Sequence, residues 1–351
     1  MKKYLVTGGA GFIGSNFVIY MLKKYSDIQI VNLDKLTYAG NLENLSSIEG
    51  DKRHIFVQAD IADQKVVSEL FAKYDFDYVI NFAAETHVDR SVLDPEVFAK
   101  TNVLGTVNLL NCAKIAWERG DGWKEGCKYL QVSTDEVYGS LGSTGFFTET
   151  TPLDPHSPYS ASKASADMFV KAYSDTYKMP VNITRCSNNY GPYQFPEKLI
   201  PLMINNAKNG KHLPIYGDGM QVRDWLYVDD HCKAIDMVCS NGKVGEVYNV
   251  GGHNERPNIF IVKTIIEILR DKVSNEINET LIKYVEDRKG HDRRYGIDPQ
   301  KIKDDLGWYP ETPFEKGIVM TINWYLENEA WMNRVTNGDY QKYYAEMYKN
   351  R

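Results

Sequence analysis

A glycine-rich turn near the N-terminus limits the folds open to this chain more than any other feature. Residues 8–14 read GGAGFIG, and they follow the β-rich run Tyr4–Thr7 and precede a stretch with helical spacing. Glycine permits a tight turn and a close approach of a ligand to the backbone N–H groups at a helix N-terminus. A strand, such a turn and a helix in this order predict the first unit of a parallel sheet.

Further β-rich runs alternate with helical segments through the first half of the 351-residue chain. They are Ile28–Asp34, His54–Asp60, Asp77–Ala84, Lys128–Thr134 and Val181–Arg185. The runs are almost continuously apolar, as expected of strands that are covered on both faces. The sequence therefore predicts an α/β fold with a doubly wound parallel sheet.

The character of the sequence changes near Tyr190, where Pro, Gly and loop residues replace the regular alternation. The buried-strand pattern of Val247–Val250 indicates that the chain returns to the sheet later. We expect residues 1–190 to form one domain, with sheet elements returning near residues 225–252. Residues 191–351 are expected to form a smaller C-terminal lobe with an interleaved boundary.

Composition and charge argue against several classes of protein. Lys and Arg number 41 against 47 Asp and Glu, and the net charge of −6 lacks the broad basic field that duplex nucleic acid requires. The five cysteines are scattered, and no His or Cys pair has metal-ligand spacing, so we expect neither disulfides nor a metal. No apolar run approaches the roughly 18 residues of a membrane helix. We therefore expect a cytoplasmic protein without a signal peptide, a membrane span or a nucleic-acid partner.

An acidic residue follows the glycine-rich turn at the spacing of a dinucleotide site. Asp34 ends the second predicted strand, about 20 residues after the turn. A carboxylate there suits the ribose hydroxyls of NAD and repels the 2′-phosphate of NADP, although Lys35 weakens this preference. Asp60 would face the adenine side, and Ala83 and Ala84 would leave room for the dinucleotide. The alternatives are a solvated strand end for the acidic residues and ordinary packing for the alanines.

A tyrosine and a lysine lie four residues apart in the segment Tyr159–Lys163, which reads YSASK. In a helix both side chains would share one face. A phenol with a pKa of about 10 is a poor base unless a cation favours the phenolate, a role open to Lys163 and the nicotinamide. Ser133 and Thr134 end the fifth predicted strand and offer a hydroxyl that could share a substrate alcohol with Tyr159.

Together these motifs resemble the extended short-chain dehydrogenase/reductase family over essentially the whole chain. The segment Asp135–Gly139, which reads DEVYG, is similar to the dTDP-glucose 4,6-dehydratases of that family, whereas the related 4-epimerases lack the acidic pair. The resemblance implies a Rossmann domain that binds NAD and a C-terminal lobe that holds a nucleotide sugar. The NAD-binding residues that it implies are Gly8, Gly11, Phe12, Ile13, Gly14, Asp34, Lys35, Thr37, Asp60, Ile61, Phe82, Ala83, Ala84, Thr101, Tyr159, Lys163 and Asn189.

The resemblance assigns different tasks to the two neighbouring carboxyl groups. Oxidation of the sugar at C4 acidifies the C5 proton, which Glu136 would remove while Asp135 protonates the departing C6 hydroxyl. Thr134, Tyr159 and Lys163 complete the implied catalytic set. The sequence leaves open which carboxyl is protonated. Neighbouring strand residues face opposite sides, so both carboxyls reach one substrate only if the chain leaves the strand at about Asp135. A pair of solvated acids is the alternative.

The implied substrate is dTDP-glucose, whose diphosphate requires positive charge in a cleft. Arg223, in the segment Gly217–Trp225, matches the arginine that contacts the diphosphate in the family. The other implied substrate-binding residues are Thr86, His87, Asn188, Lys198, Leu199, Pro214, Tyr216, Asn258, Arg288, His291 and Tyr295. Thr86 stands where many members carry serine, and it keeps the hydroxyl. Without the resemblance, Asp287–Tyr295 would be interpreted as a solvated charge run.

The implied reaction removes water from dTDP-glucose and gives dTDP-4-keto-6-deoxy-glucose, a precursor of deoxysugars such as rhamnose, with NAD regenerated in each turnover. The alternatives are a UDP-glucose 4,6-dehydratase, a 4-epimerase, a decarboxylase or a non-catalytic NAD-binding regulator. The resemblance also implies a homodimer that pairs helices within Pro95–Ala116 and Tyr159–Tyr177 as a four-helix interface. Thymidine and uridine differ here by little more than a methyl group, so the sequence does not decide between them.

Overall fold

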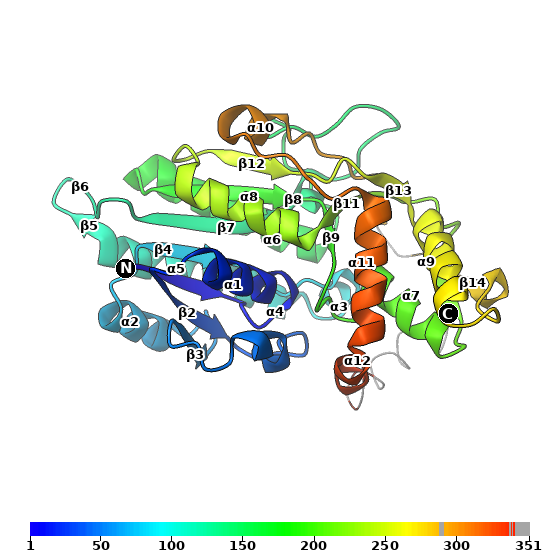
Figure 1. The fold of residues 1–351 in the computed structure, drawn as a ribbon. Coiled ribbons are helices and arrows are strands. Elements are labelled where there is room, and N and C mark those ends of the chain that lie inside the picture. The colour runs from blue at the N-terminus through cyan, green and yellow to red at the C-terminus, as the bar shows by residue number, and fades with distance from the viewer. Residues whose placement is uncertain (288–290, 337, 339, 341–351) are drawn as a thin grey trace.

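The fold is built on a seven-stranded sheet, seen in a computed structural model that describes residues 1–287, 291–336, 338 and 340 (Figure 1). Its strands are β1 (Lys2–Thr7), β2 (Ile28–Asp34), β3 (His54–Gln58), β4 (Tyr78–Asn81), β7 (Lys128–Thr134), β8 (Val181–Cys186) and β12 (Val247–Val250). They lie in the order β12-β8-β7-β4-β1-β2-β3, and every neighbouring pair is parallel. The predicted α/β fold with a parallel sheet is confirmed.

At the carboxyl edge of the sheet, the connections that follow β1 and β4 run in opposite directions. The chain leads from β1 outward to β3, and then returns to β4 on the other side of β1 before it continues to β7 and β8. The segments that follow β1 and β4 therefore diverge, and this is where open α/β sheets bind ligands. The predicted strand Asp77–Ala84 ends at Asn81, so Ala83 and Ala84 lie in the loop at this edge.

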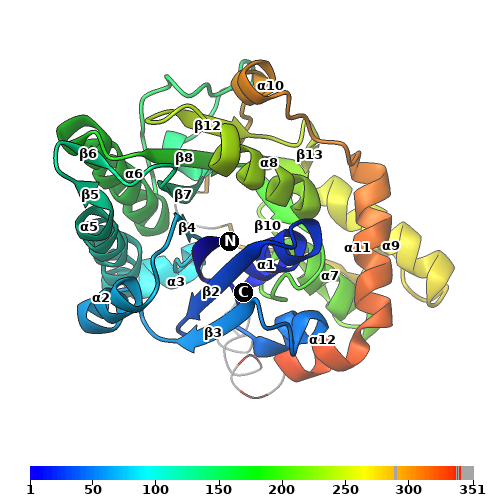
Figure 2. The ribbon, with the colours of Figure 1, turned by 60° about the vertical axis from the view of Figure 1, so that its left-hand side comes forward.

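Helices cover both faces of the sheet, as Figure 2 shows. The two on one face are α1 (Phe12–Lys24) and α8 (Val228–Asn241). The other face carries α2 (Gln64–Lys73), α5 (Gly105–Trp117) and α6 (Pro158–Tyr177). Alternate strand residues point to opposite faces, so β1 buries Val6 beneath the first pair of helices and Leu5 beneath the other three. Coverage on both faces explains the almost continuously apolar strands.

Local sequence sets the start of α6, the helix that carries Tyr159 and Lys163. Ser157 is the N-cap residue, and its side chain forms a capping box with Ser160. The proline that follows occupies the first turn, where its fixed φ suits a helix and its missing N–H costs nothing. The predicted helical segment Tyr159–Tyr177 is confirmed.

A second lobe lies beyond the carboxyl edge of the sheet (Figure 1). Its helices are α7 (Leu199–Lys208), α9 (Asn258–Lys272), α11 (Phe314–Glu327) and α12 (Glu329–Val335), and its strands are β9 (Asn188–Tyr190), β10 (Leu213–Tyr216), β11 (Val222–Tyr227), β13 (Glu255–Pro257) and β14 (Ile282–Val285). The strands form two small sheets, in the orders β10-β14 and β13-β11-β9. A separate core, which includes Leu202, Ile215, Ile265 and Phe314, holds the lobe together.

The shorter elements connect these layers. They are η1 (Leu42–Ile48), α3 (Val88–Leu93), α4 (Pro95–Phe98), the π-helical η2 (Ala99–Leu104), β5 (Glu118–Arg119), β6 (Gly122–Trp123), η3 (Asp135–Tyr138), η4 (Glu279–Leu281) and α10 (Gln300–Leu306). Within the described part of the chain, no helix has the length and apolar character needed to cross a membrane. The residues that the structure describes also contain no cluster of three or more His, Cys, Asp and Glu side chains that could hold a metal ion.

Candidate functional site

Two adjoining cavities lie at the carboxyl edge of the sheet. The first has a volume of about 300 Å³ and is lined by the segments that follow β1, β2, β3, β4 and β7. The second has a volume of about 180 Å³ and lies between this edge and the second lobe. Both cavities are lined by Thr86, Glu136, Asn188, Asn189, Gln194, Glu197 and Lys198. A ligand that spans both would therefore pass Glu136.

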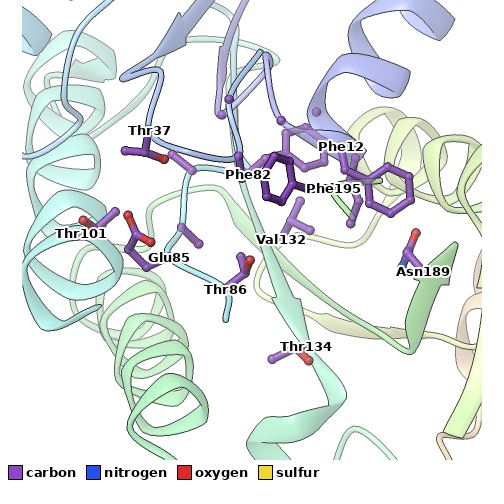
Figure 3. A pocket seen from close by; sticks show the side chains of 18 of the residues that line it. Phe12, Thr37, Phe82, Glu85, Thr86, Thr101, Val132, Thr134, Asn189 and Phe195 are labelled. Atoms are coloured by element: carbon purple, nitrogen blue, oxygen red, sulfur yellow. The ribbon is translucent and has the colours of Figure 1, made fainter. Parts of the chain in front are cut away.

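The first cavity gathers all the residues that the sequence implied for NAD, together with all five of the implied catalytic residues. Figure 3 shows how widely they are spread, from Thr37 and Thr101 at one end, past Phe82, to Asn189 at the other. The sequence had not singled out several further residues that line this cavity, and these include Glu85, Val132, Cys186, Ser187, Gln194, Phe195 and Glu197.

The glycine-rich turn has the geometry of a cradle for a phosphate group. Gly8 has a φ of 70°, and a Cβ there would come within 2.7 Å of the Ala83 backbone nitrogen. A Cβ at Gly14 would collide with the carbonyl oxygen of Gly8. No side chain caps the N-terminus of α1 at Gly11, so its first N–H groups face the cavity uncapped. Close backbone approach and an uncapped helix N-terminus together suit a pyrophosphate.

Asp34 stands at the end of β2, where a ribose would lie. Its side chain is buried and accepts hydrogen bonds from the backbone N–H groups of Ala10, at 2.9 Å, and Leu36, at 2.8 Å. Lys35 pairs with Asp60 at 2.9 Å, so its charge is directed to the neighbouring strand end and balanced there. This pairing removes much of the reason to expect that Lys35 favours a 2′-phosphate. The carboxylate of Asp34, as an acceptor for ribose hydroxyls, therefore suits NAD.

The two acidic residues leave the strand together. β7 ends at Thr134, and the short helix η3 begins at Asp135, with Thr134 as its N-cap. The Thr134 hydroxyl accepts a hydrogen bond from the Glu136 N–H at 3.3 Å. The chain therefore leaves the strand at Asp135, which is the condition for both carboxyl groups to reach one substrate, and both line the first cavity.

The structure favours protonation of Asp135, a point that the sequence left open. Its side chain is only 1% exposed. Burial, and next the carboxylates of Glu136 and Asp224, raise the pKa of Asp135 well above its usual range, against the opposing effect of Arg223. The Thr134 hydroxyl donates to Oδ1 at 3.2 Å, whereas Oδ2 has no hydrogen-bond partner among the described residues. Oδ2 is thus the oxygen on which no neighbouring group competes with a proton.

Tyr159 and Lys163 lie in α6 next to this pair, and both are buried. The Lys163 ammonium donates to the carbonyl oxygen of Val132 at 2.7 Å, and burial lowers its pKa. Burial, and next the Glu136 carboxylate, raise the pKa of Tyr159 well above its usual range. Burial therefore opposes the phenolate, and the expectation that Lys163 and the nicotinamide favour it stays a prediction.

The second cavity gathers the implied substrate-binding residues that lie beyond the shared boundary. They are His87, Leu199, Pro214, Tyr216, Arg223, Asn258, His291 and Tyr295. Arg288 lies outside the described residues. The Arg223 guanidinium is held over the Tyr295 ring, 4.2 Å from its centroid, and donates to the Asp292 carbonyl at 3.0 Å. The Lys198 ammonium donates to the Thr86 carbonyl at 3.0 Å. Arg223 and Lys198 thus bring the positive charge that a diphosphate requires to a cavity that the carboxyl groups of Glu136, Glu197 and Asp292 also line.

Glu197 is the most notable cavity residue that the sequence reasoning missed. Its side chain is 1% exposed and lines both cavities. Its only signal in the sequence was its position next to Lys198, just before a helical segment. Burial raises its pKa, while Lys198 and Arg90 oppose this effect.

Sequence comparisons show that this chain is similar to nucleotide-sugar 4,6-dehydratases. The family model described as GDP-mannose 4,6 dehydratase matches residues 5–321. A dTDP-glucose 4,6-dehydratase of Xanthomonas campestris pv. campestris (strain B100) is 54% identical over 345 residues, 97% of this chain and 98% of that protein.

Similar solved structures also include those of dTDP-glucose 4,6-dehydratases. The dTDP-glucose 4,6-dehydratase of Bacillus anthracis str. Ames in complex with NAD is 50% identical, with a TM-score of 0.86, over 95% of this chain and 100% of that chain. DesIV, a dTDP-glucose 4,6-dehydratase from Streptomyces venezuelae that was solved with NAD bound, is 44% identical, with a TM-score of 0.88, over 95% and 99% of the two chains. The chain belongs to the dTDP-glucose 4,6-dehydratase family.

Proposed function

We propose that this protein is an NAD-dependent dTDP-glucose 4,6-dehydratase that converts dTDP-glucose into dTDP-4-keto-6-deoxy-glucose. The observation that carries the proposal is the position of Asp135 and Glu136 at the end of β7: both line the first cavity with Tyr159, and Glu136 also lines the second. A dehydration needs an acid and a base on the same substrate, and an epimerisation does not. The names of the relatives, and the NAD bound to two of their structures, support the same reading.

NAD would occupy the first cavity, with its pyrophosphate at the glycine-rich turn and a ribose at Asp34. When bound, NAD⁺ accepts a hydride and later returns it, so the cofactor is regenerated within each turnover. Its positive nicotinamide ring would favour the phenolate of Tyr159. Tyr159 takes the proton of the C4 hydroxyl as the hydride leaves C4, while Thr134 holds that oxygen by a hydrogen bond.

Elimination would use the two carboxyl groups in different protonation states, one as the base and the other as the acid. Glu136, as carboxylate, takes the C5 proton, which the C4 ketone has made acidic. Asp135, protonated on its unpartnered oxygen, gives that proton to the C6 hydroxyl, which leaves as water. The hydride would then return to C6 and Glu136 would return its proton to C5, while Tyr159 would release its proton to solvent and Asp135 would regain one from solvent. The net change is the loss of one water, with no net oxidation.

The second cavity would bind the nucleotide end of the substrate. We assign the diphosphate to Arg223, with Lys198 and His291 near it, and the hydroxyls and base edge to the amides of Asn188 and Asn258. The division into a domain of residues 1–190 and a lobe of residues 191–351 is part of this proposal. The return of α8 and β12 to the main sheet supports an interleaved boundary.

We also propose a cytoplasmic homodimer. Large apolar side chains are exposed along α3, α4, η2, α5 and α6, and they are Val92, Leu93, Val97, Leu104, Ile115, Met168, Phe169 and Tyr177. Exposed apolar groups gathered on neighbouring helices are typical of a protein interface. Light scattering coupled to size-exclusion chromatography checks this proposal, and a monomer at micromolar concentration would contradict it.

Product mass tests the proposed reaction. The purified protein is incubated with dTDP-glucose or UDP-glucose that carries deuterium at C4, with and without added NAD. We expect loss of one water with the deuterium retained at C6, faster with dTDP-glucose. An unchanged mass with conversion to the galactose isomer would indicate a 4-epimerase. No reaction in the presence of NAD would favour a non-catalytic regulator.

A further inference from the structure

Tyr38 connects the two cavities although it lines neither of them. Its neighbours Thr37, Ala39 and Gly40 line the first cavity. The Tyr38 hydroxyl points to the second lobe and donates to the Oε1 atom of Glu197 at 3.0 Å. This hydrogen bond joins residues 159 positions apart in the chain, and its acceptor lines both cavities.

The loop that carries Tyr38 is tied to the first cavity at both of its ends. At one end, the Leu36 N–H donates to Asp34 at 2.8 Å. At the other end, the Asn41 N–H donates to the Ala10 carbonyl, within the glycine-rich turn, at 3.0 Å. Movement of Tyr38 would therefore move the loop that closes this side of the first cavity.

Glu197 is held in place by the groups around it. The Arg90 guanidinium stacks on the Tyr38 ring, 3.7 Å from its centroid, and its Nε lies 3.6 Å from the Oε2 atom of Glu197. The Phe195 ring meets the Tyr38 ring edge-on at 5.6 Å. Because the Glu197 side chain is 1% exposed, water cannot easily replace the tyrosine hydroxyl.

We propose that Tyr38 is a positioning residue that, through its hydrogen bond to Glu197, couples the retention of NAD to occupancy of the substrate cavity. This inference rests on the proposed function. A nucleotide in the second cavity packs against the segment of residues 197–199 and restricts Glu197. The hydrogen bond passes that restriction to the loop over the first cavity. The coupling is reciprocal, so bound NAD also strengthens nucleotide binding.

The test measures NAD release in the absence of turnover. The wild type and the variants Tyr38→Phe and Tyr25→Phe are loaded with NADH, and its dissociation is followed by fluorescence with and without saturating dTDP. Tyr25→Phe is a matched control, because its hydroxyl also donates to a carboxylate, that of Asp236, at 3.0 Å, and lines neither cavity. We expect dTDP to slow NADH release from the wild type and the control.

The ratio of the NADH release rates without and with dTDP should be roughly tenfold smaller in Tyr38→Phe than in the wild type. This factor corresponds to the usual free energy of a hydrogen bond to a charged group. Equal slowing in Tyr38→Phe and the wild type would overturn the coupling. The melting temperatures of the two unliganded variants should match, and a much lower value for Tyr38→Phe would assign the effect to general loosening instead. Failure of the wild type to convert dTDP-glucose, with both ligands bound, would contradict the proposed reaction and leave the measured coupling intact.

Discussion

Replacement of Asp135 by asparagine removes the acidic proton of this residue and keeps the size and shape of its side chain. The amide oxygen of the variant can accept the hydrogen bond that the Thr134 hydroxyl gives to Oδ1 at 3.2 Å, and the amide nitrogen takes the place of the unpartnered Oδ2. No hydrogen bond is lost and the buried site keeps its volume, although the amide N–H groups find no acceptor there, at a cost of about 1–3 kcal/mol in stability. The variant should therefore fold, bind NAD and oxidise the sugar at C4.

The elimination step should slow by about 10²–10⁴, the usual contribution of a general acid, which corresponds to about 3 to 5 kcal/mol in the barrier. Oxidation at C4 does not use this proton, so reduced cofactor and 4-keto-glucose nucleotide should accumulate. Stopped-flow absorbance of NADH and rapid-quench mass spectrometry measure the two quantities. Wild-type turnover, or slow turnover with no accumulation of NADH, would refute the assignment of Asp135 as the acid.

The same variant tests the protonation state through stability. Asp135 in the unfolded chain loses its proton near pH 4, whereas the raised pKa keeps it protonated in the folded chain to higher pH. The folded state then binds more protons, so this group's contribution to the free energy of unfolding falls as pH rises above about 4. Asparagine does not titrate. The free energy of unfolding of the variant, measured in urea, should therefore rise relative to that of the wild type as pH increases above about 4. A difference that stays constant across this range would show that Asp135 is ionised in the folded state.

Three further substitutions test the structure around the site. Gly8→Ala should lose NAD retention and about 1–3 kcal/mol of stability, because its φ is 70° and its Cβ would meet the Ala83 backbone; equilibrium dialysis and thermal unfolding measure both. Arg185→Met should cost about 3–5 kcal/mol in urea unfolding, since it leaves the buried Asp167 carboxylate without the guanidinium at 2.9 Å. Ser157→Ala should cost about 1 kcal/mol through loss of the α6 cap, and an unchanged melting temperature would contradict the capping box.

Features that depend on neighbours in the chain could be read from the sequence. The turn at residues 8–14 needs glycine for steric reasons that act within a few residues, and the spacing of Tyr159 and Lys163 places them on one helix face wherever that helix lies. Apolar runs identified the strands, because burial on both faces leaves no room for alternation. Strand ends were less well defined, as the shortened β4 shows, because the last residues are set by the loops that follow.

Features that depend on distant parts of the chain were decided only by the tertiary structure. The raised pKa of Asp135 follows from burial, from its neighbour Glu136 and from Asp224 in the second lobe; Glu136 is visible in the sequence, whereas the burial and Asp224 are not. The contact of Tyr38 with Glu197 spans 159 positions and needs both lobes in place. The sequence by itself determined the fold class and the kinds of group present at the site. The packing of one lobe against the other decided which carboxyl group has the raised pKa and which residues line both cavities, because desolvation and charge act through space rather than along the chain.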